Sequence, residues 1–164
     1  LHTNGYSLAR RVIADQDQLA PRDDLEGRSL ADALLAPHRA YLAEVGRLRS
    51  GAGDQAGVDV KGLAHITGGG LVDNPPRILP ADVAMRIETT AWPRPSLFAL
   101  LQRLGGIGEA EMRHVFNVGL GMLVVVPAAE ATRALALLDA PGMAKAWPVG
   151  EVVERGTGLA VVFP

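Results

Sequence analysis

Apolar residues recur every three or four positions in several segments, a spacing that is typical of helices with one buried face. Ser7 and Ser29 precede two of these segments as candidate N-caps, and Pro37 follows one of them as a stop signal. Helices are therefore expected over residues 8–17, 30–36, 41–48, 97–104, 109–115 and 128–138, with a short helix from residue 71 to the prolines at 75 and 76.

Shorter apolar or alternating runs predict strands. Val83, Met85 and Ile87 alternate with more polar neighbours, which indicates a half-buried strand. Strands are expected over residues 60–67, 81–89, 122–126, 144–153 and 158–163, and loops over residues 18–28 and 50–57. Strands and helices mixed in this order predict an α/β (α+β) fold, a layered mixed sheet packed by helices, in a single domain that spans residues 1–164.

Composition narrows the class of protein. The 164 residues are 48% hydrophobic and 21% charged, which excludes a wholly disordered chain, and no run of about 18 apolar residues predicts a transmembrane helix. A formal net charge of −2 argues against nucleic acid or an anionic membrane as the main partner. The absence of cysteine excludes disulfides and thiolate zinc sites. The chain opens on Leu1 instead of Met, so a trimmed, processed or excised chain is expected, and the first residues do not have the pattern of a signal peptide.

Glycine is abundant: it makes up 19 of the 164 residues, about 12%, whereas its average share in proteins is about 7%. The sharpest local feature is Gly68-Gly69-Gly70, which follows the predicted strand and precedes the short helix. Glycines let a ligand approach backbone amides closely, and amides at a helix start favour an anion such as phosphate. Thr67 could add a hydroxyl, His65 a proton donor and Arg77 a guanidinium. The alternative is a glycine-rich turn with His65 as an ordinary strand residue, and the Gly-Lys-Ser/Thr ending of a P-loop is missing.

Other polar features are weaker. The segment from His2 to Ser7 could bind a ligand or merely cap a helix, and Gly119-x-Gly121 could mark close packing or a ligand. The four histidines lack metal-ligand spacing, no serine lies in a nucleophile elbow, and Asp23-Asp24 is interpreted as a solvated loop. No metal ligand is predicted in this chain.

Taken together, these segments resemble the C-terminal domain of the aminoimidazole ribonucleotide synthetase (phosphoribosylformylglycinamidine cyclo-ligase) family. The order and spacing of the motifs match over essentially the whole chain, and the most specific match is His-Ile-Thr-Gly-Gly-Gly followed by Asn-x-Pro-Arg. The matching stretches are residues 1–8, 62–71, 74–80, 111–112 and 116–122.

The resemblance implies an ATP-dependent reaction of purine biosynthesis. ATP phosphorylates the formyl amide oxygen of formylglycinamidine ribonucleotide, an internal nitrogen attacks that carbon, phosphate leaves and the imidazole ring closes. In this family ATP and magnesium are held mainly by an N-terminal domain, which these 164 residues do not contain. The resemblance therefore implies that the chain alone lacks turnover, that the missing N-terminal domain is its partner, and that the full-length enzyme is a homodimer. The absence of cysteine and of targeting signals predicts a cytoplasmic location.

The resemblance also implies site residues. His65 and Thr67 are the candidate catalytic residues, His65 as a hydrogen-bond donor or general acid. The candidate substrate- or phosphate-binding residues are His2, Asn4, Gly68, Gly69, Gly70, Asn74 and Arg77. Two alternatives stay open: a related enzyme with the same two-half plan, such as selenophosphate synthetase, thiamine-monophosphate kinase or formylglycinamidine ribonucleotide synthetase, and a non-catalytic binding module.

Overall fold

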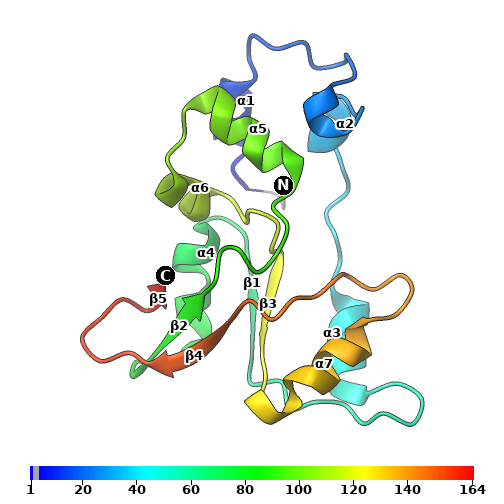
Figure 1. Cartoon of the computed structure of the whole chain (residues 1–164), viewed down its shortest axis with the longest axis vertical. Helices are drawn as coiled ribbons and strands as arrows, with labels where there is room; N and C mark the ends of the chain where they lie inside the picture. The colour runs from blue at the N-terminus through cyan, green and yellow to red at the C-terminus, as the bar shows by residue number, and fades with distance from the viewer. Residues whose placement is uncertain (2–3) are drawn as a thin grey trace. The chain divides into compact units, whose positions relative to one another are not determined.

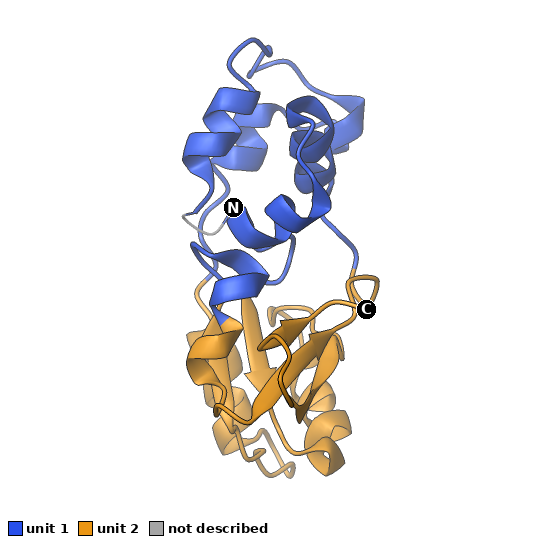
Figure 2. Cartoon of the chain, turned by 90° about the vertical axis from the view of Figure 1, so that its left-hand side faces the viewer, with its two compact units in different colours: residues 1–39, 66–74, 93–121 blue, residues 40–65, 75–92, 122–164 orange. Residues whose placement is uncertain are grey.

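The computed structural model describes residue 1 and residues 4–164. The chain divides into two compact units, each built from three separate segments (Figure 2). Unit 1 comprises residues 1–39, 66–74 and 93–121, and unit 2 comprises residues 40–65, 75–92 and 122–164. None of the helices in the described part of the chain is long and apolar enough to cross a membrane.

All the regular secondary structure in the described residues of unit 1 is helical. It contains α1 (Tyr6–Val12), the 3-10 helix η1 (Asp23–Leu25), α2 (Leu30–Leu34), α4 (Gly70–Asp73), α5 (Ser96–Gly105) and α6 (Glu109–Val115). Helix α5 contacts α1, η1 and α6, and therefore lies at the centre of the unit (Figure 1).

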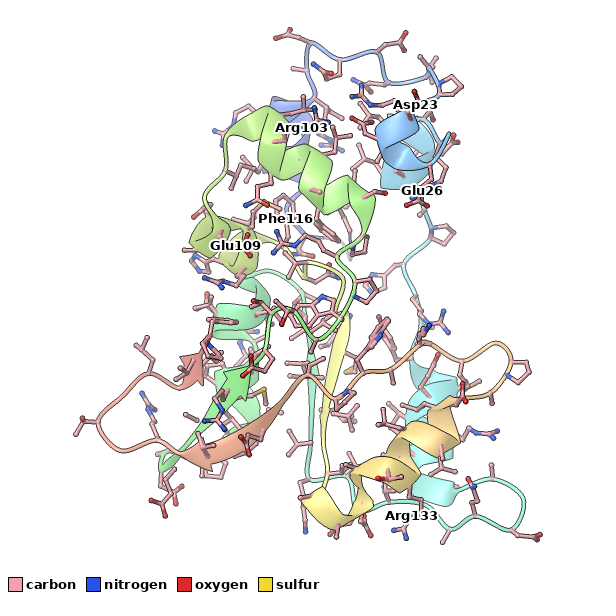
Figure 3. The ribbon with its side chains drawn as sticks, in the orientation of Figure 1. Asp23, Glu26, Arg103, Glu109, Phe116 and Arg133 are labelled. Atoms are coloured by element: carbon pink, nitrogen blue, oxygen red, sulfur yellow. The ribbon has the colours of Figure 1, made fainter. Side chains whose placement is uncertain are left out.

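The core of unit 1 forms around the apolar face of α5. Leu97, Leu100 and Leu101 are buried on this helix at the spacing that predicted one apolar face. Phe116 is fully buried, and its ring centroid lies 5.9 Å from that of Phe98 (Figure 3). Aromatic pairs at this separation add to the free energy gained by burying apolar surface. The sequence pattern therefore predicted the apolar face of α5, whereas it did not predict the contact between Phe98 and Phe116.

Unit 2 carries all the strands found in the described residues. It contains α3 (Leu42–Ser50), β1 (Gly62–His65), the 3-10 helix η2 (Pro75–Ile78), β2 (Val83–Ile87), β3 (Met122–Val125), the 3-10 helix η3 (Ala128–Glu130), α7 (Ala131–Leu138), β4 (Gly150–Glu154) and β5 (Val161–Val162).

The strands form two small sheets (Figure 1). Strands β1 and β3 pair antiparallel, with His65 opposite Met122, and the other sheet has the order β4-β2-β5. In that sheet β2 pairs antiparallel with β4 and parallel with β5, so the pairing is mixed. Helices α3 and α7 pack together over a small apolar cluster that includes Leu48 and Leu137. The predicted α+β fold class is confirmed, and its strands are divided between two sheets.

Two of the predicted helices differ from the structure by more than one residue at their starts. The first helix begins at Tyr6, after Gly5 at φ 74°, so Ser7 lies inside the helix and the cap prediction there was wrong. Ser29 does cap α2, in a reciprocal capping box with Asp32. The segment predicted as one helix over 128–138 begins with the 3-10 turn η3.

The ends of other elements also differ, for local reasons. The first helix stops at Val12 instead of residue 17, and a turn follows in which the amide of Gln16 donates to the carbonyl oxygen of Ile13 at 3.0 Å. The carboxylate of Asp17 then accepts the amides of Leu19 and Ala20 in a second turn. The strand expected from residue 144 begins only at Gly150, because Pro148 has no N–H for a ladder. The expected strands 60–67, 81–89 and 158–163 shorten to 62–65, 83–87 and 161–162.

Candidate functional site: the glycine loop

The glycine segment predicted from the sequence forms a tight loop of unit 1, which we call the glycine loop (residues 66–74). The amide of Gly70 donates to the carbonyl oxygen of Thr67 at 3.0 Å, and α4 then extends for a single turn. A four-residue helix aligns only a few peptide dipoles, so its macrodipole contributes little. Any anion bound here would depend on the loop amides themselves.

The three glycines of the loop have different structural reasons to be glycine. Gly70 has φ +56°, and a Cβ there would lie 2.1 Å from the carbonyl oxygen of Arg113. Gly69 has φ +94°, and its Cβ would lie 2.7 Å from the Cβ of Asp73. Gly68 is exposed, its φ is not positive, and a Cβ would meet no described atom within 4 Å. The fold therefore requires glycine at two positions of the triplet and leaves Gly68 without such a requirement.

Two amides of the loop remain available. The Gly70 amide is bonded inside the loop, whereas those of Gly68 and Gly69 donate to no acceptor among the described residues. Successive backbone N–H groups in a turn of this kind can surround an anion. The hydroxyl of Thr67 lies nearby in sequence and is half-buried, 3.5 Å from Oδ1 of Asn74. The loop can therefore offer two amides to an oxyanion, and the Thr67 hydroxyl could join them if it turned away from Asn74.

Asn74 holds the loop from inside. Its side chain is 4% exposed, and its Nδ2 donates to the carbonyl oxygens of Gly70 at 2.8 Å and Gly68 at 3.1 Å. The same nitrogen lies 3.4 Å from the carbonyl oxygen of Thr67. Because the amide group is buried and its hydrogens are used by the loop, Asn74 fixes the loop conformation.

Asn4 joins the glycine loop to the end of α6. Its Nδ2 lies 3.0 Å from the carbonyl oxygen of Thr67 and 2.6 Å from that of Val115, and the residue is 8% exposed. Gly5 follows with φ +74° and packs so closely on Phe116 that a Cβ would lie 2.3 Å from the ring atom Cε1. Of the segment predicted as a ligand-binding or capping region, Asn4 therefore holds the loop in place, and we call this contact the Asn4 brace.

A second turn follows α6 and is linked to the glycine loop. The amide of Leu120 donates to the carbonyl oxygen of Asn117 at 2.9 Å, and Val118 and Gly119 between them have φ 42° and 108°. A β-branched residue at positive φ is a backbone outlier. The Ile66 amide donates to the carbonyl oxygen of Gly121 at 2.9 Å and ties the two turns together. The sequence contained no signal for the strained backbone of Val118, although Gly119-x-Gly121 was predicted to mark close packing or a ligand.

Charges near the loop are paired. Nε2 of His114 on α6 lies 3.0 Å from Oδ2 of Asp73 on α4, and both side chains are half exposed. This contact gives the Asp73 carboxylate beside Gly69 a side-chain partner. Among the described residues, no group of three or more His, Cys, Asp or Glu side chains lies close enough to hold a metal ion.

The structure gathers part of the predicted set. Unit 1 brings together Asn4, Thr67, the three glycines and Asn74. His65 and Arg77 belong to unit 2, where both are exposed, and no described carboxylate pairs with Arg77. The ring centroid of His65 lies 6.2 Å from that of Tyr41, a residue that the sequence analysis did not select. His2 lies outside the described residues.

Three proteins named phosphoribosylformylglycinamidine cyclo-ligase match nearly the whole chain. The protein from Burkholderia cenocepacia is 47% identical over 162 residues, which is 98% of this chain and 43% of that protein. The one from Paraburkholderia xenovorans is 44% identical over 98% of the chain and 43% of its own length. The one from a Thermoanaerobacter species is 40% identical over 97% of the chain and 46% of its own length. The chain thus spans less than half the length of these relatives.

A family model described as "AIR synthase related protein, C-terminal domain" matches residues 1–162. The match includes the glycine loop, the Asn4 brace and the turn after α6. The chain therefore belongs to the family of AIR synthase related C-terminal domains.

Proposed function

We propose that this chain is the C-terminal part of a phosphoribosylformylglycinamidine cyclo-ligase, which closes the imidazole ring of aminoimidazole ribonucleotide in purine biosynthesis at the expense of ATP. The observation that carries the proposal is the 47% identity to a protein of that name over 98% of the chain. The substrate is formylglycinamidine ribonucleotide. The residues between Asn4 and Gly121 that the reaction would use belong to the matched region.

The glycine loop supplies the anion-binding part of this proposal. When bound, ATP converts the formyl amide oxygen of the substrate into a phosphorylated leaving group. The amides of Gly68 and Gly69 and the hydroxyl of Thr67 would hold phosphate oxygens of the substrate or of the transferred phosphoryl group. Fixed donors of this kind stabilise developing charge without reorganising during the reaction.

Positioning is the role we assign to the buried asparagines. Asn4 and Asn74 were expected to bind substrate, but their carboxamide nitrogens are occupied by backbone carbonyls of the loop and of α6. We propose that they hold the loop amides in place, and that His65 acts as hydrogen-bond donor or general acid. His2 and Arg77 remain proposed substrate-binding residues on the family resemblance.

Magnesium ligands are assigned to the part of the protein outside this chain. The described residues offer no acidic cluster for the ion, so we derive no step through it. We propose that ATP is likewise held mainly outside this chain, that the full-length enzyme is a cytoplasmic homodimer, and that the 164-residue chain alone lacks turnover.

The decisive experiment uses the full-length protein. The full-length gene should restore growth without purines to a bacterial strain that lacks its own cyclo-ligase, and the purified protein should form ADP and aminoimidazole ribonucleotide together. A folded full-length protein that fails in both assays would overturn the proposal. Activity as a selenophosphate synthetase or thiamine-monophosphate kinase in its place would assign the chain to a related enzyme, and stable ligand binding without turnover would identify a binding module.

A further inference from the structure

His65 ends β1 as an exposed side chain with a defined aromatic neighbour. Its backbone is fixed by the antiparallel register, in which His65 lies opposite Met122. The ring of Tyr41 lies against the imidazole, with centroids 6.2 Å apart and ring planes at 68°, an edge-to-face arrangement. Both residues belong to unit 2, although 24 positions separate them in the sequence.

The backbone of Tyr41 is also held in place. Tyr41 precedes α3, and its carbonyl oxygen accepts the amide of Val45 at 3.0 Å, the first hydrogen bond of that helix. The side chain is half-buried, so the surrounding protein restricts its motion. Tyr41 therefore offers the imidazole a rigid aromatic wall.

A ring contact of this kind narrows the orientations that an exposed imidazole can take. The ring of a surface histidine can exchange among staggered rotamers, and each neighbour that contacts it restricts this exchange. Edge-to-face aromatic pairs contribute about 0.5–1.5 kcal/mol beyond area burial, which is enough to favour one rotamer severalfold. We infer that Tyr41 is a positioning residue for the reaction, one that holds the His65 imidazole in the orientation it uses toward the substrate. This inference rests on the proposed function.

The kinetic test compares two substitutions in the full-length enzyme. Tyr41→Phe keeps the ring and should retain kcat, whereas Tyr41→Leu keeps apolar bulk but removes the ring. The edge-to-face contact with His65 needs an aromatic ring at position 41, and only Tyr41→Leu removes that ring. Tyr41→Leu should therefore lower kcat by about twofold to tenfold. The KM for ATP should stay unchanged in both variants. A Tyr41→Leu enzyme with unchanged kcat, or a Tyr41→Phe enzyme that loses as much as Tyr41→Leu, would overturn the inference.

A spectroscopic test separates this inference from the proposed function. In proton NMR spectra of the full-length protein, the imidazole C–H signals of His65, assigned by their loss in His65→Ala, should carry a ring-current shift from Tyr41. That shift should persist in Tyr41→Phe and disappear in Tyr41→Leu. Its absence from the unsubstituted protein would refute the positioning role directly. If His65→Ala itself leaves turnover unchanged while the ring-current shift is present, the catalytic role proposed for His65 fails and the contact stands as structural.

Discussion

The side-chain nitrogen of Asn4 lies 3.0 Å from the carbonyl oxygen of Thr67, a contact between residues 63 positions apart in the sequence. The same nitrogen donates to the carbonyl oxygen of Val115. One buried carboxamide therefore connects the glycine loop, the start of the chain and the end of α6. The geometry of the loop amides depends on this connection as well as on the loop's own sequence.

Replacing Asn4 should destabilise unit 1 in a way that depends on the new side chain. Asn4→Ala leaves the carbonyl of Val115 without its donor and removes one of the donors of Thr67, whose carbonyl oxygen still accepts the Gly70 amide. The loss of these part-buried hydrogen bonds costs about 1–3 kcal/mol of unfolding free energy. Aspartate has nearly the shape of asparagine, but Asn4→Asp places a carboxylate oxygen where the Nδ2 donor stood. At neutral pH Asn4→Asp should therefore lower the free energy of unfolding more than Asn4→Ala does. Urea denaturation of the two variants measures the difference. Equal stability of the Asn4→Asp variant and the unsubstituted protein would show that the hydrogen bonds to Thr67 and Val115 do not hold the loop.

Gly70 and Gly106 separate backbone strain from a steric clash. Both have positive φ, +56° and +58°, but only a Cβ on Gly70 would meet a neighbour, the carbonyl oxygen of Arg113 at 2.1 Å. Gly106→Ala should therefore cost about 1–2 kcal/mol for the left-handed conformation alone. Gly70→Ala should cost several kcal/mol more, because the clash is with backbone that cannot turn away. Thermal unfolding of both variants tests this order, and a Gly106→Ala protein that is the less stable of the two would contradict it.

Gly68 offers the opposite test, in which stability should not change. A Cβ at Gly68 would meet nothing within 4 Å and would not occupy positive φ, and the same holds for Gly108 at the start of α6. Gly68→Ala and Gly108→Ala should both keep the melting temperature. If the loop amides hold a phosphate group, the new methyl group at Gly68 obstructs it, and kcat/KM of the full-length enzyme should fall by about tenfold or more, a loss of roughly 1.4 kcal/mol. Full activity of the Gly68→Ala enzyme would show that the glycine loop does not bind the phosphate group.

Local signals in the sequence predicted much of the fold. The Ser29 cap, the apolar face of α5 and helix α6, whose observed bounds Glu109–Val115 match the expected ones, all depend on residues within one or two turns of each other. The glycine loop was located for the same reason, since its turn uses its own residues. Short-range chemistry of this kind can be identified from spacing alone.

Long-range contacts could not be predicted in the same way. The role of Asn4 depends on carbonyl groups 63 and 111 positions away, and the contact between Tyr41 and His65 joins residues 24 positions apart in the sequence. The start of the first helix was misplaced because Gly5 adopts positive φ to pack on Phe116, a contact that no local pattern reveals. The sequence indicated which polar residues could take part in a site, and the structure showed which of them contact one another.

A charged network joins α5 and α6 in unit 1. Arg94 donates to both carboxylate oxygens of Glu109, and Gln102 donates to Oε2 of the same carboxylate at 3.0 Å (Figure 3 marks Glu109). The hydrogen bonds from Arg94 lower the pKa of Glu109 below its ordinary value, with a smaller contribution from Gln102, while partial burial acts in the opposite direction. The ionised carboxylate is therefore favoured more in the folded chain than in the unfolded chain.

The pH dependence of stability should report this network. Because the folded pKa of Glu109 is lowered, its contribution is fully present above the unfolded value of about 4.5 and is lost as the pH falls through the lower folded pKa. Glu109→Gln removes the charge, so the variant should be less stable than the unsubstituted protein at pH 7. The gap, which is the difference in unfolding free energy between the two proteins, should narrow below about pH 4. Glu111→Gln, which removes the same charge from an α6 position with no ion pair among the described residues, is the matched control and should show no such narrowing. Urea unfolding at pH 7, 5 and 3.5 measures both gaps, and a Glu109→Gln gap that stays constant or widens in acid would show that the contact with Arg94 does not stabilise the ionised carboxylate in solution.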